Sequence, residues 1–483
     1  MRQTTSSEFR DIILRTYPGI DKSVSYWRFM QYLLFGRKDK VNGCPVISQH
    51  QVAKAEGKLE IAKESTNYNA AKFLLSFQSI VMGEDAFQWS AWSFKEGLAR
   101  TALVKFTPEV EQALELERYN FMNTETRVYF ETGDKYSPRL EKLSRDLIKA
   151  EANTYLDLCA PEARELAEYL NDLPVNSFTK VIEANLNETL VKAFNIEDPE
   201  LSRLQVEILA TIRDVLKPFY KGSDKGKTVR IFPFNYSIPM LTKGLRKTLT
   251  KGWVEFDLTS CQLAIAAKMW EIEEIQEFLR SGESIWISLI NHYGLDGLNM
   301  KYNDNPRYEL IKEDLKDSLY SLMYGMVKKN LIADLTEDLE RFGIVDGGKT
   351  YMTHPIIKIL YQSREQRMKE LNDYDSVQTV FGKVIHLRGS KLSDGSPDDL
   401  RKEYIRSVMA QQAQAIELYL MLPVLDLAKT TKDFIITIFQ HDGCSINFTN
   451  KSKKKKWLTR IVGAVQARAD ELGILTGLEY VEL

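Results

Sequence analysis

The sequence has little cysteine and no long apolar run. Its four cysteines lie far apart: Cys44, Cys159, Cys261 and Cys444. They form no Cys-x-x-Cys pair, so neither a zinc site nor a disulfide framework is indicated. No apolar stretch approaches the roughly 20 residues that a membrane-spanning helix requires, and the first residues lack the apolar core of a signal peptide. We therefore expect a cytoplasmic protein with no membrane association.

The sequence also lacks a strong excess of basic residues. The chain has 65 Lys and Arg residues against 67 Asp and Glu residues, for a formal net charge of −2. This balance excludes a protein coated in positive charge, but a nucleic-acid enzyme is still compatible with it because local clustering matters. Lysines gather within residues 217–252 and in the run Lys451–Lys456. Such runs are usually solvated loops, but in the sequence these two flank the candidate acids described below.

The length and composition are those of a globular protein. With 483 residues, 44% of them hydrophobic and 27% charged, the chain is long enough for two or three domains with a large core. Nothing in the composition indicates disorder.

One helix-sized stretch, Arg307 to Lys329, has an unusual polar face. Two lysines and two tyrosines follow one another at intervals of four residues, which places them on one stripe of a helix: Lys312, Lys316, Tyr320 and Tyr324. The apolar face is supplied separately, by Leu315, Leu319, Leu322 and Met323. The basic and aromatic stripe is therefore available to a ligand with phosphates and a ring, although a solvated charged face is about equally compatible with this stretch alone.

Two further stretches place acids at strand ends. Residues 253–270 read as a strand that ends near Asp257 and passes into a helix. Residues 434–448 read as two apolar strands around the polar turn His441-Asp442-Gly443, which predicts a β-hairpin with an acid at its tip.

These three stretches together resemble the motifs of the family A (DNA polymerase I) polymerases and of their relatives, the phage-type single-subunit RNA polymerases. Asp257 matches the aspartate of the first motif. The second motif, a basic residue, three residues, Lys, seven residues and Tyr-Gly, is matched by Lys312, Lys316, Tyr324 and Gly325. His441 and Asp442 match the third motif. Each motif alone is weak, but all three occur in the family's order and spacing.

The resemblance covers roughly residues 216–483 and implies a right-hand polymerase of the α+β class. It implies an antiparallel palm sheet from residues 216–275 and 376–483, helical fingers from 276–375 and a thumb-like helical region at 121–215. Residues 1–120 form a mainly helical N-terminal region without an assigned role. Two strands joined at Gly382 and a final strand at the C-terminus are expected by the same comparison.

The resemblance also implies roles for individual residues. The carboxylates of Asp257 and Asp442 and the carbonyl of Leu258 would bind two Mg²⁺ ions, for which Mn²⁺ is a substitute. Lys316 would act on the triphosphate as a catalytic residue. The nucleotide would contact Lys312, Lys316, Tyr320, Tyr324 and Gln262. Primer and template would contact Arg230, Gln411, His441 and Gly325, with Gln412 and Gln414 as close alternatives to Gln411.

Several positions depart from the family pattern. The DNA polymerases of the family have a glutamate that blocks the ribose 2′-hydroxyl where this chain has Gln262, and an amide donates as well as accepts hydrogen bonds, so exclusion of ribonucleotides is expected to be weaker. Lys312 replaces an arginine and loses its bidentate fork. Gly443 replaces the family's less essential acid. Tyr320 and the lack of a glycine-rich run after Asp257 favour DNA synthesis.

The resulting hypothesis is a DNA-dependent DNA polymerase of phage or plasmid type that extends a primer with dNTPs. The segment 123–126 has an asparagine where a proofreading exonuclease has its first carboxylate, so we predict no proofreading. We expect a monomer that binds a DNA primer-template and works with replication accessory proteins. Three alternatives remain: a single-subunit RNA polymerase or primase-like enzyme that uses NTPs, a reverse transcriptase, and a non-catalytic nucleic-acid-binding protein of the same fold.

Overall fold

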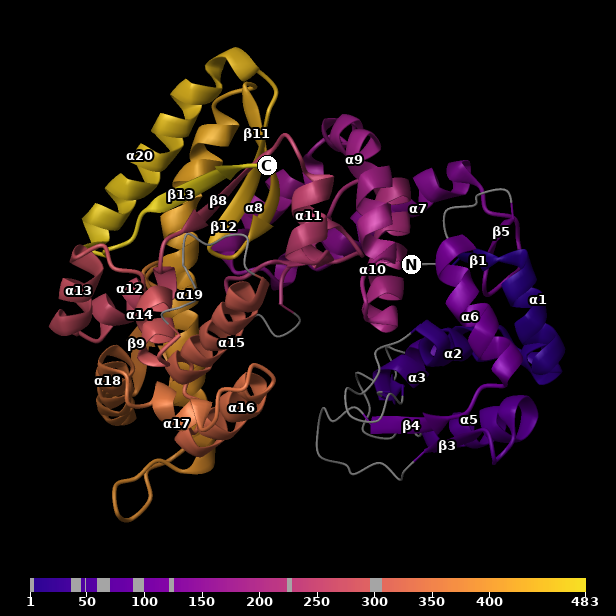
Figure 1. Ribbon diagram of the computed structural model, residues 1–483, viewed down its shortest axis with the longest axis horizontal. Coiled ribbons are helices and arrows are strands. Elements are labelled where there is room, and N and C mark those ends of the chain that lie inside the picture. Colours follow the sequence, from indigo (N-terminus) through magenta and orange to yellow (C-terminus); the bar gives the residue numbers. More distant parts are fainter. Residues whose placement is uncertain are drawn as a thin grey trace. The chain divides into compact units, whose positions relative to one another are not determined.

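The computed structural model describes residues 4–35, 45–47, 49–58, 70–89, 100–120, 126–223, 228–295 and 306–483. The chain divides into two compact units (Figure 1). The first comprises Met1–Ala150, Val175–Pro218 and Asn235–Thr250, and the second comprises Glu151–Pro174, Phe219–Phe234 and Lys251–Leu483. The segment predicted as thumb-like, 121–215, is therefore shared between the two units.

The first unit consists of helices with two small antiparallel sheets. Its helices are α1 (Ser7–Thr16), α2 (Val24–Phe35), α3 (Gln49–Glu56), α5 (Ala70–Phe77), α6 (Pro108–Asn120), most of α7 (Pro138–Thr154), α9 (Asn176–Phe194), α10 (Pro199–Val215) and α11 (Lys243–Leu249). Its strands are β1 (Thr4–Ser6), β2 (Val46–Ile47), β3 (Phe87–Trp89), β4 (Arg100–Val104) and β5 (Arg127–Tyr129), paired as β1-β5 and β2-β4-β3. The helices agree with the prediction for residues 1–120, but the sheet β2-β4-β3 was not predicted. Strands this short leave no readable alternation of polar and apolar residues.

The second unit is built on a four-stranded antiparallel sheet with the order β11-β12-β8-β13. These strands are β11 (Phe434–Gln440), β12 (Gly443–Phe448), β8 (Val254–Leu258) and β13 (Leu478–Glu482). The predicted hairpin and the predicted final strand are both present. Two smaller pairs are β6 (Tyr220–Lys221) with β7 (Phe232–Pro233), and β9 (Ser376–Gln378) with β10 (Val384–His386). The expected turn at Gly382, whose φ is +79°, joins the second pair.

Helices make up the rest of the second unit. They are α8 (Pro161–Asp172), α12 (Cys261–Met269), α13 (Glu273–Arg280), α14 (Ile285–His292), α15 (Pro306–Met323), α16 (Lys328–Glu340), α17 (Gly347–Tyr351), α18 (Pro355–Asn372), α19 (Asp399–Lys429) and α20 (Lys454–Leu472). Helices α12 to α18 share one apolar core, to which α15 contributes the predicted face of Leu315, Leu319, Leu322 and Met323. The helical prediction for residues 276–375 is thus confirmed over the described residues.

The long helix α19 connects these two parts of the unit. Its first turn is capped by Asp398, whose carboxylate accepts a hydrogen bond from the backbone N–H of Arg401 at 2.7 Å. Along its length α19 contacts α12, α18, α20 and β11. It therefore runs past both the sheet and the helical part, as Figure 1 shows.

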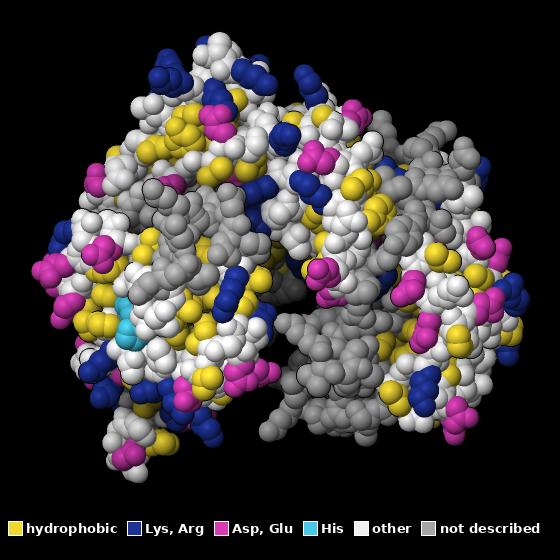
Figure 2. All heavy atoms as spheres, viewed as in Figure 1, with side chains coloured by type: hydrophobic (Ala, Val, Ile, Leu, Met, Phe, Trp, Pro, Cys, Tyr) yellow, Lys and Arg dark blue, Asp and Glu magenta, His cyan; other side chains and the backbone are white. Residues whose placement is uncertain are grey.

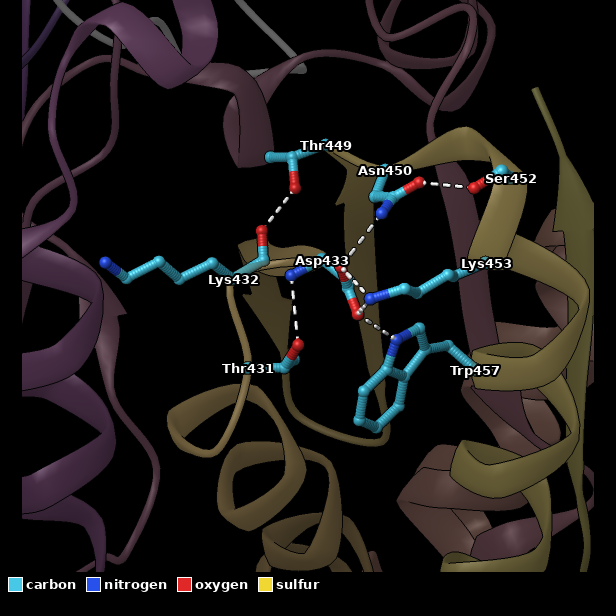
Figure 3. Close-up of polar contacts among 8 residues, drawn as sticks. All are labelled: Thr431, Lys432, Asp433, Thr449, Asn450, Ser452, Lys453 and Trp457. Carbon is cyan, nitrogen blue, oxygen red and sulfur yellow. Dashed lines mark hydrogen bonds and ion pairs between the residues drawn. The ribbon is translucent and has the colours of Figure 1, made fainter.

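The base of the β11–β12 hairpin is anchored by Asp433 (Figure 3). Its carboxylate accepts hydrogen bonds from Trp457 Nε1 at 2.9 Å, Asn450 Nδ2 at 3.1 Å and Lys453 Nζ. These bonds, first that of Trp457, lower the pKa of Asp433 to about 2. The network attaches the N-terminal end of α20 to the start of β11.

The lysine run Lys451–Lys456 belongs to this same base. Figure 2 shows basic side chains gathered around the upper end of the second unit, where α20 begins. One strand, β12, separates this end from the acidic tip, a span of about 20 Å at roughly 3.3 Å per residue. The run follows Asp442 closely in sequence but is remote from it in the fold.

All strand pairs in the described part of the chain are antiparallel, so the expected mixture of helices with antiparallel sheet is confirmed. The assignment of palm, fingers and thumb stays a prediction. No helix among the described residues is long and apolar enough to cross a membrane.

Candidate active site

The two predicted aspartates meet at one end of the sheet in the second unit, Asp257 on β8 and Asp442 in the turn before β12. In the ladder between β8 and β12, Asp257 lies opposite Gly443, the residue that follows Asp442. The backbone N–H of Leu258 donates to the carbonyl oxygen of Asp442 at 3.0 Å. The hairpin register thus brings the two aspartates to adjacent positions at one end of the sheet, although they are far apart in the sequence.

The hairpin tip is tighter than predicted. Gln440 pairs directly with Gly443, so the turn consists of His441 and Asp442 alone, and His441 takes a left-handed φ of +55°. Gly443 is already part of β12. The three-residue turn of the sequence analysis is therefore corrected to two residues.

The packing around Gly443 explains why a glycine occupies this position. A Cβ atom there would lie 2.7 Å from the carbonyl oxygen of Phe256 and 3.2 Å from Oδ1 of Asp257. The first of these distances is shorter than a normal van der Waals contact. It involves a backbone atom of the sheet, which could shift only by disturbing the strand pairing. The acid that the family carries at this position does not fit on this backbone.

His441 is held as a neutral ring beside the two acids. Its imidazole packs edge-on against Phe232, with the ring centroids 5.9 Å apart. Burial lowers the pKa of His441 to about 4, and the charge of Arg230 acts in the same direction. At neutral pH the side chain therefore offers one hydrogen-bond donor and one acceptor and no charge.

Helix α15 presents its basic and aromatic stripe as predicted. The ammonium of Lys312 lies 5.9 Å from the ring centroid of Tyr308, and that of Lys316 lies 5.5 Å from the ring of Tyr320. Both distances are within cation–π range. Each lysine is half-buried by its stem, while the leucines of the helix face the core.

Tyr320 lies within electrostatic range of the two aspartates, and Tyr324 lies within range of Glu417 on α19. Burial is the first cause that raises the pKa of Tyr320, and the carboxylates of Asp442, Glu417 and Asp257 raise it further. The pKa of Tyr324 is likewise raised by burial and then by Glu417. Of the two tyrosines, Tyr320 is therefore the one on which the charges of the two aspartates act.

The C-terminal end of α15 is held by one arginine, Arg364, and closely approached by another, Arg406, neither of which was predicted. Arg364 donates from Nη1 to the carbonyl oxygens of Leu322 and Met326, both at 2.9 Å. Gly325 has a φ of +87°, and a Cβ atom there would lie 2.7 Å from Cγ of Arg406. Gly325 thus lets α19 approach the helix end closely.

An open pocket of about 580 Å³ adjoins this helix end. The pocket is lined by Asp317, Tyr320, Ser321, Tyr324, Gly325, Met326 and Arg406. Three of the predicted nucleotide or template residues therefore share one pocket with a guanidinium, a group that suits phosphate.

Gln262 does not stand free beside the pocket. Its side chain is only 2% exposed, and its amide nitrogen donates to the carboxylate of Glu417 on α19. The other oxygen of Glu417 accepts from Nη2 of Arg230 at 2.8 Å. Burial raises the pKa of Glu417, an effect that Arg230 opposes. Glu417 thus joins two predicted site residues.

The three predicted glutamines of α19 have different surroundings. Gln411 is half-buried and donates to Oγ of Ser407 at 3.0 Å, one turn earlier on the same helix. Gln412 is buried and donates to the carbonyl oxygen of Gln378 at 2.9 Å. Gln414 accepts from Oγ1 of Thr228, next to the segment of Arg230. Gln412 is thus the most buried of the three, and the template role stays a prediction for Gln411, with Gln412 and Gln414 as alternatives.

Glu417 and Arg406 were missed by sequence reasoning. One signal was available, because Glu417 is the only charged residue between Arg406 and Asp426. A lone carboxylate in an apolar helical stretch must find a partner when it is buried. Its partners come from distant segments, so the sequence could not name them.

The two aspartates suit a hard divalent cation. No group of three or more His, Cys, Asp and Glu side chains able to hold a metal exists among the described residues. Magnesium needs only one or two carboxylates when phosphates and waters supply its other ligands. Asp257, Asp442 and the Leu258 carbonyl therefore fit a magnesium site completed by a phosphorylated substrate.

No protein-family model matches this chain, and no curated protein matches it. A solved structure of the POL domain of Pol1 from M. smegmatis, in complex with DNA primer-template and dNTP, is similar in part. The alignment covers 77% of this chain and 72% of that chain, with 13% sequence identity and a TM-score of 0.41. Similarity at this level transfers no residue role from one chain to the other.

Proposed function

We propose that this protein is a template-directed nucleotidyltransferase, specifically a DNA-dependent DNA polymerase that extends a primer without proofreading. The observation that supports it most is the meeting of Asp257 and Asp442 at one end of the sheet, within electrostatic range of Tyr320 on the helix that also carries Lys312 and Lys316. The sequence motifs that suggested the activity belong to three separate segments, and the fold brings them together.

Each candidate residue has a proposed role that follows from its chemistry. Asp257, Asp442 and the carbonyl of Leu258 would hold two Mg²⁺ ions, which would supply an activated 3′-hydroxyl and charge neutralisation when bound. Lys316 and Lys312 provide positive charge for the triphosphate. The rings of Tyr320 and Tyr324 offer stacking faces for a base or sugar. Neutral His441 and the guanidinium of Arg230 would donate to primer and template.

The absence of proofreading stays a proposal based on the sequence alone. Residues 123–125, which hold the asparagine in place of the exonuclease carboxylate, lie outside the described residues.

The test is extension of a labelled primer on a DNA template with Mg²⁺, with dNTPs and NTPs in separate reactions and a third reaction without primer. Extension with dNTPs alone supports the proposal. Synthesis from NTPs, above all without a primer, would move the protein to RNA synthesis or priming. No product under any condition, from a protein that still binds primer-template, would overturn the enzyme assignment in favour of a nucleic-acid-binding protein.

A further inference from the structure

Glu417 is a buried carboxylate that none of the motifs includes, yet it contacts two of the predicted site residues. Its side chain is 3% exposed and lies on α19, between apolar neighbours. One oxygen receives Arg230 at 2.8 Å and the other receives the amide of Gln262. A carboxylate in such surroundings costs stability unless it is paired, so its position calls for an explanation beyond packing.

The contact decides which way the amide of Gln262 points. An ionised carboxylate only accepts hydrogen bonds, so the NH₂ group of Gln262 must face Glu417 and its Oε1 must face away. Oε1 of Gln262 is buried and has no hydrogen-bond partner among the described residues. Arg230 in turn anchors Glu417, so the amide is held by a charged pair rather than by a flexible side chain.

We propose that Glu417 is a positioning residue that holds Gln262 in place, so that the pair excludes the ribose 2′-hydroxyl as one rigid wall. This inference rests on the proposed polymerase function. It replaces the expectation that Gln262, as an amide that donates as well as accepts hydrogen bonds, would exclude ribonucleotides weakly. A side chain that can rotate away tolerates one extra hydroxyl, whereas one fixed on both sides does not.

The central test is a double-mutant cycle with Gln262→Ala and Glu417→Ala. The quantity measured is the ratio of kcat/KM for dNTP to kcat/KM for NTP in single-nucleotide primer extension. Each single variant should lower this ratio about tenfold, the effect expected for one lost hydrogen bond to a charged group. The double variant should be no worse than Gln262→Ala, because the two residues act as one unit. Independent, multiplying effects would overturn the proposal.

Two further variants distinguish a positioning role of Glu417 from a purely structural one. Exchanging the pair, as Gln262→Glu with Glu417→Gln, keeps one amide and one carboxylate and should restore most of the discrimination. Glu403→Ala removes an exposed acid from the same helix and should leave the ratio unchanged. A purely structural role would instead lower extension with dNTPs and NTPs equally, with no recovery in the exchanged pair.

Thermal unfolding of the wild type, the two single alanine variants and the double variant measures the contact between Gln262 and Glu417 independently of catalytic activity. Non-additive unfolding temperatures are expected if Gln262 and Glu417 interact, and additive ones would overturn the contact itself. Failure of the wild-type protein to extend a primer would overturn the proposed function and the discrimination role together. In that case the unfolding cycle would still decide whether Glu417 positions Gln262.

Discussion

The β11–β12 hairpin has an aspartate near each end, and the two have opposite surroundings. At the base, Asp433 accepts hydrogen bonds from an indole, an amide and an ammonium, which lower its pKa to about 2. At the tip, Asp442 adjoins Asp257 and acts electrostatically on buried Glu417. Donors around an acid stabilise its charged form, whereas two neighbouring carboxylates repel each other unless a cation or a shared proton relieves the repulsion. This difference is why the proposed function uses the tip of the hairpin and not its base.

Replacing the aspartates at the two ends of the hairpin should separate loss of activity from loss of stability most clearly. Asp442→Asn and Asp257→Asn should each reduce primer extension on the order of 10³-fold or more, because an amide is a poor ligand for the catalytic cations. Fluorescence anisotropy should show primer-template binding largely retained. The matched variant Asp433→Asn should keep nearly wild-type activity at low temperature while its unfolding temperature falls. Retained synthesis in both tip variants would remove the two-metal assignment.

Removing the positive charge of Lys316 on α15 should have the next largest effect. Lys316→Ala should reduce kcat/KM for dNTPs roughly 10²-fold, since a positive group near the triphosphate stabilises charge in the transition state. Lys329→Ala, which removes an exposed lysine just beyond the same helix, serves as the control. Equal effects of the two variants would show that Lys316 contributes only general positive charge.

Adding one methyl group at the tip tests the packing directly. Gly443→Ala should lower the free energy of unfolding by about 1–3 kcal/mol, because its Cβ would meet the carbonyl oxygen of Phe256. Activity should fall as well, since the change displaces Asp257 and Asp442. Gly463→Ala is the control, because a Cβ there meets no atom within 4 Å. This helical substitution should raise stability slightly, by about 0.5–1 kcal/mol.

Acid should destabilise the two ends in different pH windows. The pKa of His441 is lowered from 6.5 to about 4, so the unfolded chain binds its proton first and stability falls as pH drops from about 6.5 to 4. The effect is on the order of 1–3 kcal/mol. His441→Gln should flatten this part of the pH profile measured by denaturant unfolding. It should not abolish the slope, because burial also lowers the pKa of His354 to about 4.

Asp433 should respond only in stronger acid. Its pKa is lowered from 3.8 to about 2, so its contribution is complete above pH 3.8 and is lost as pH falls through about 2. Asp433→Asn should remove this dependence and leave the window of His441 unchanged. A variant that changes both windows would show that the two ends of the hairpin are coupled.

Much of the local structure could be predicted from the sequence. Spacings of three and four residues marked the apolar face of α15, and two apolar runs around His441 and Asp442 marked the hairpin. Both signals are local, because the period of a helix and the residues of a turn are read within a short window. The sheet β2-β4-β3 and the division of the chain into two units were not predicted, since they depend on pairings between distant segments.

The sequence by itself therefore determined which residues are candidates for the proposed chemistry: two aspartates at strand ends and a helix with lysines and tyrosines on one face. Only the tertiary structure decided what surrounds them. It placed the lysine run Lys451–Lys456 at the far end of the hairpin, left no room for a side chain at Gly443, and paired Gln262 with Glu417 from another helix. Burial and hydrogen-bond partners arise when remote segments pack together, and no short-range pattern contains that information.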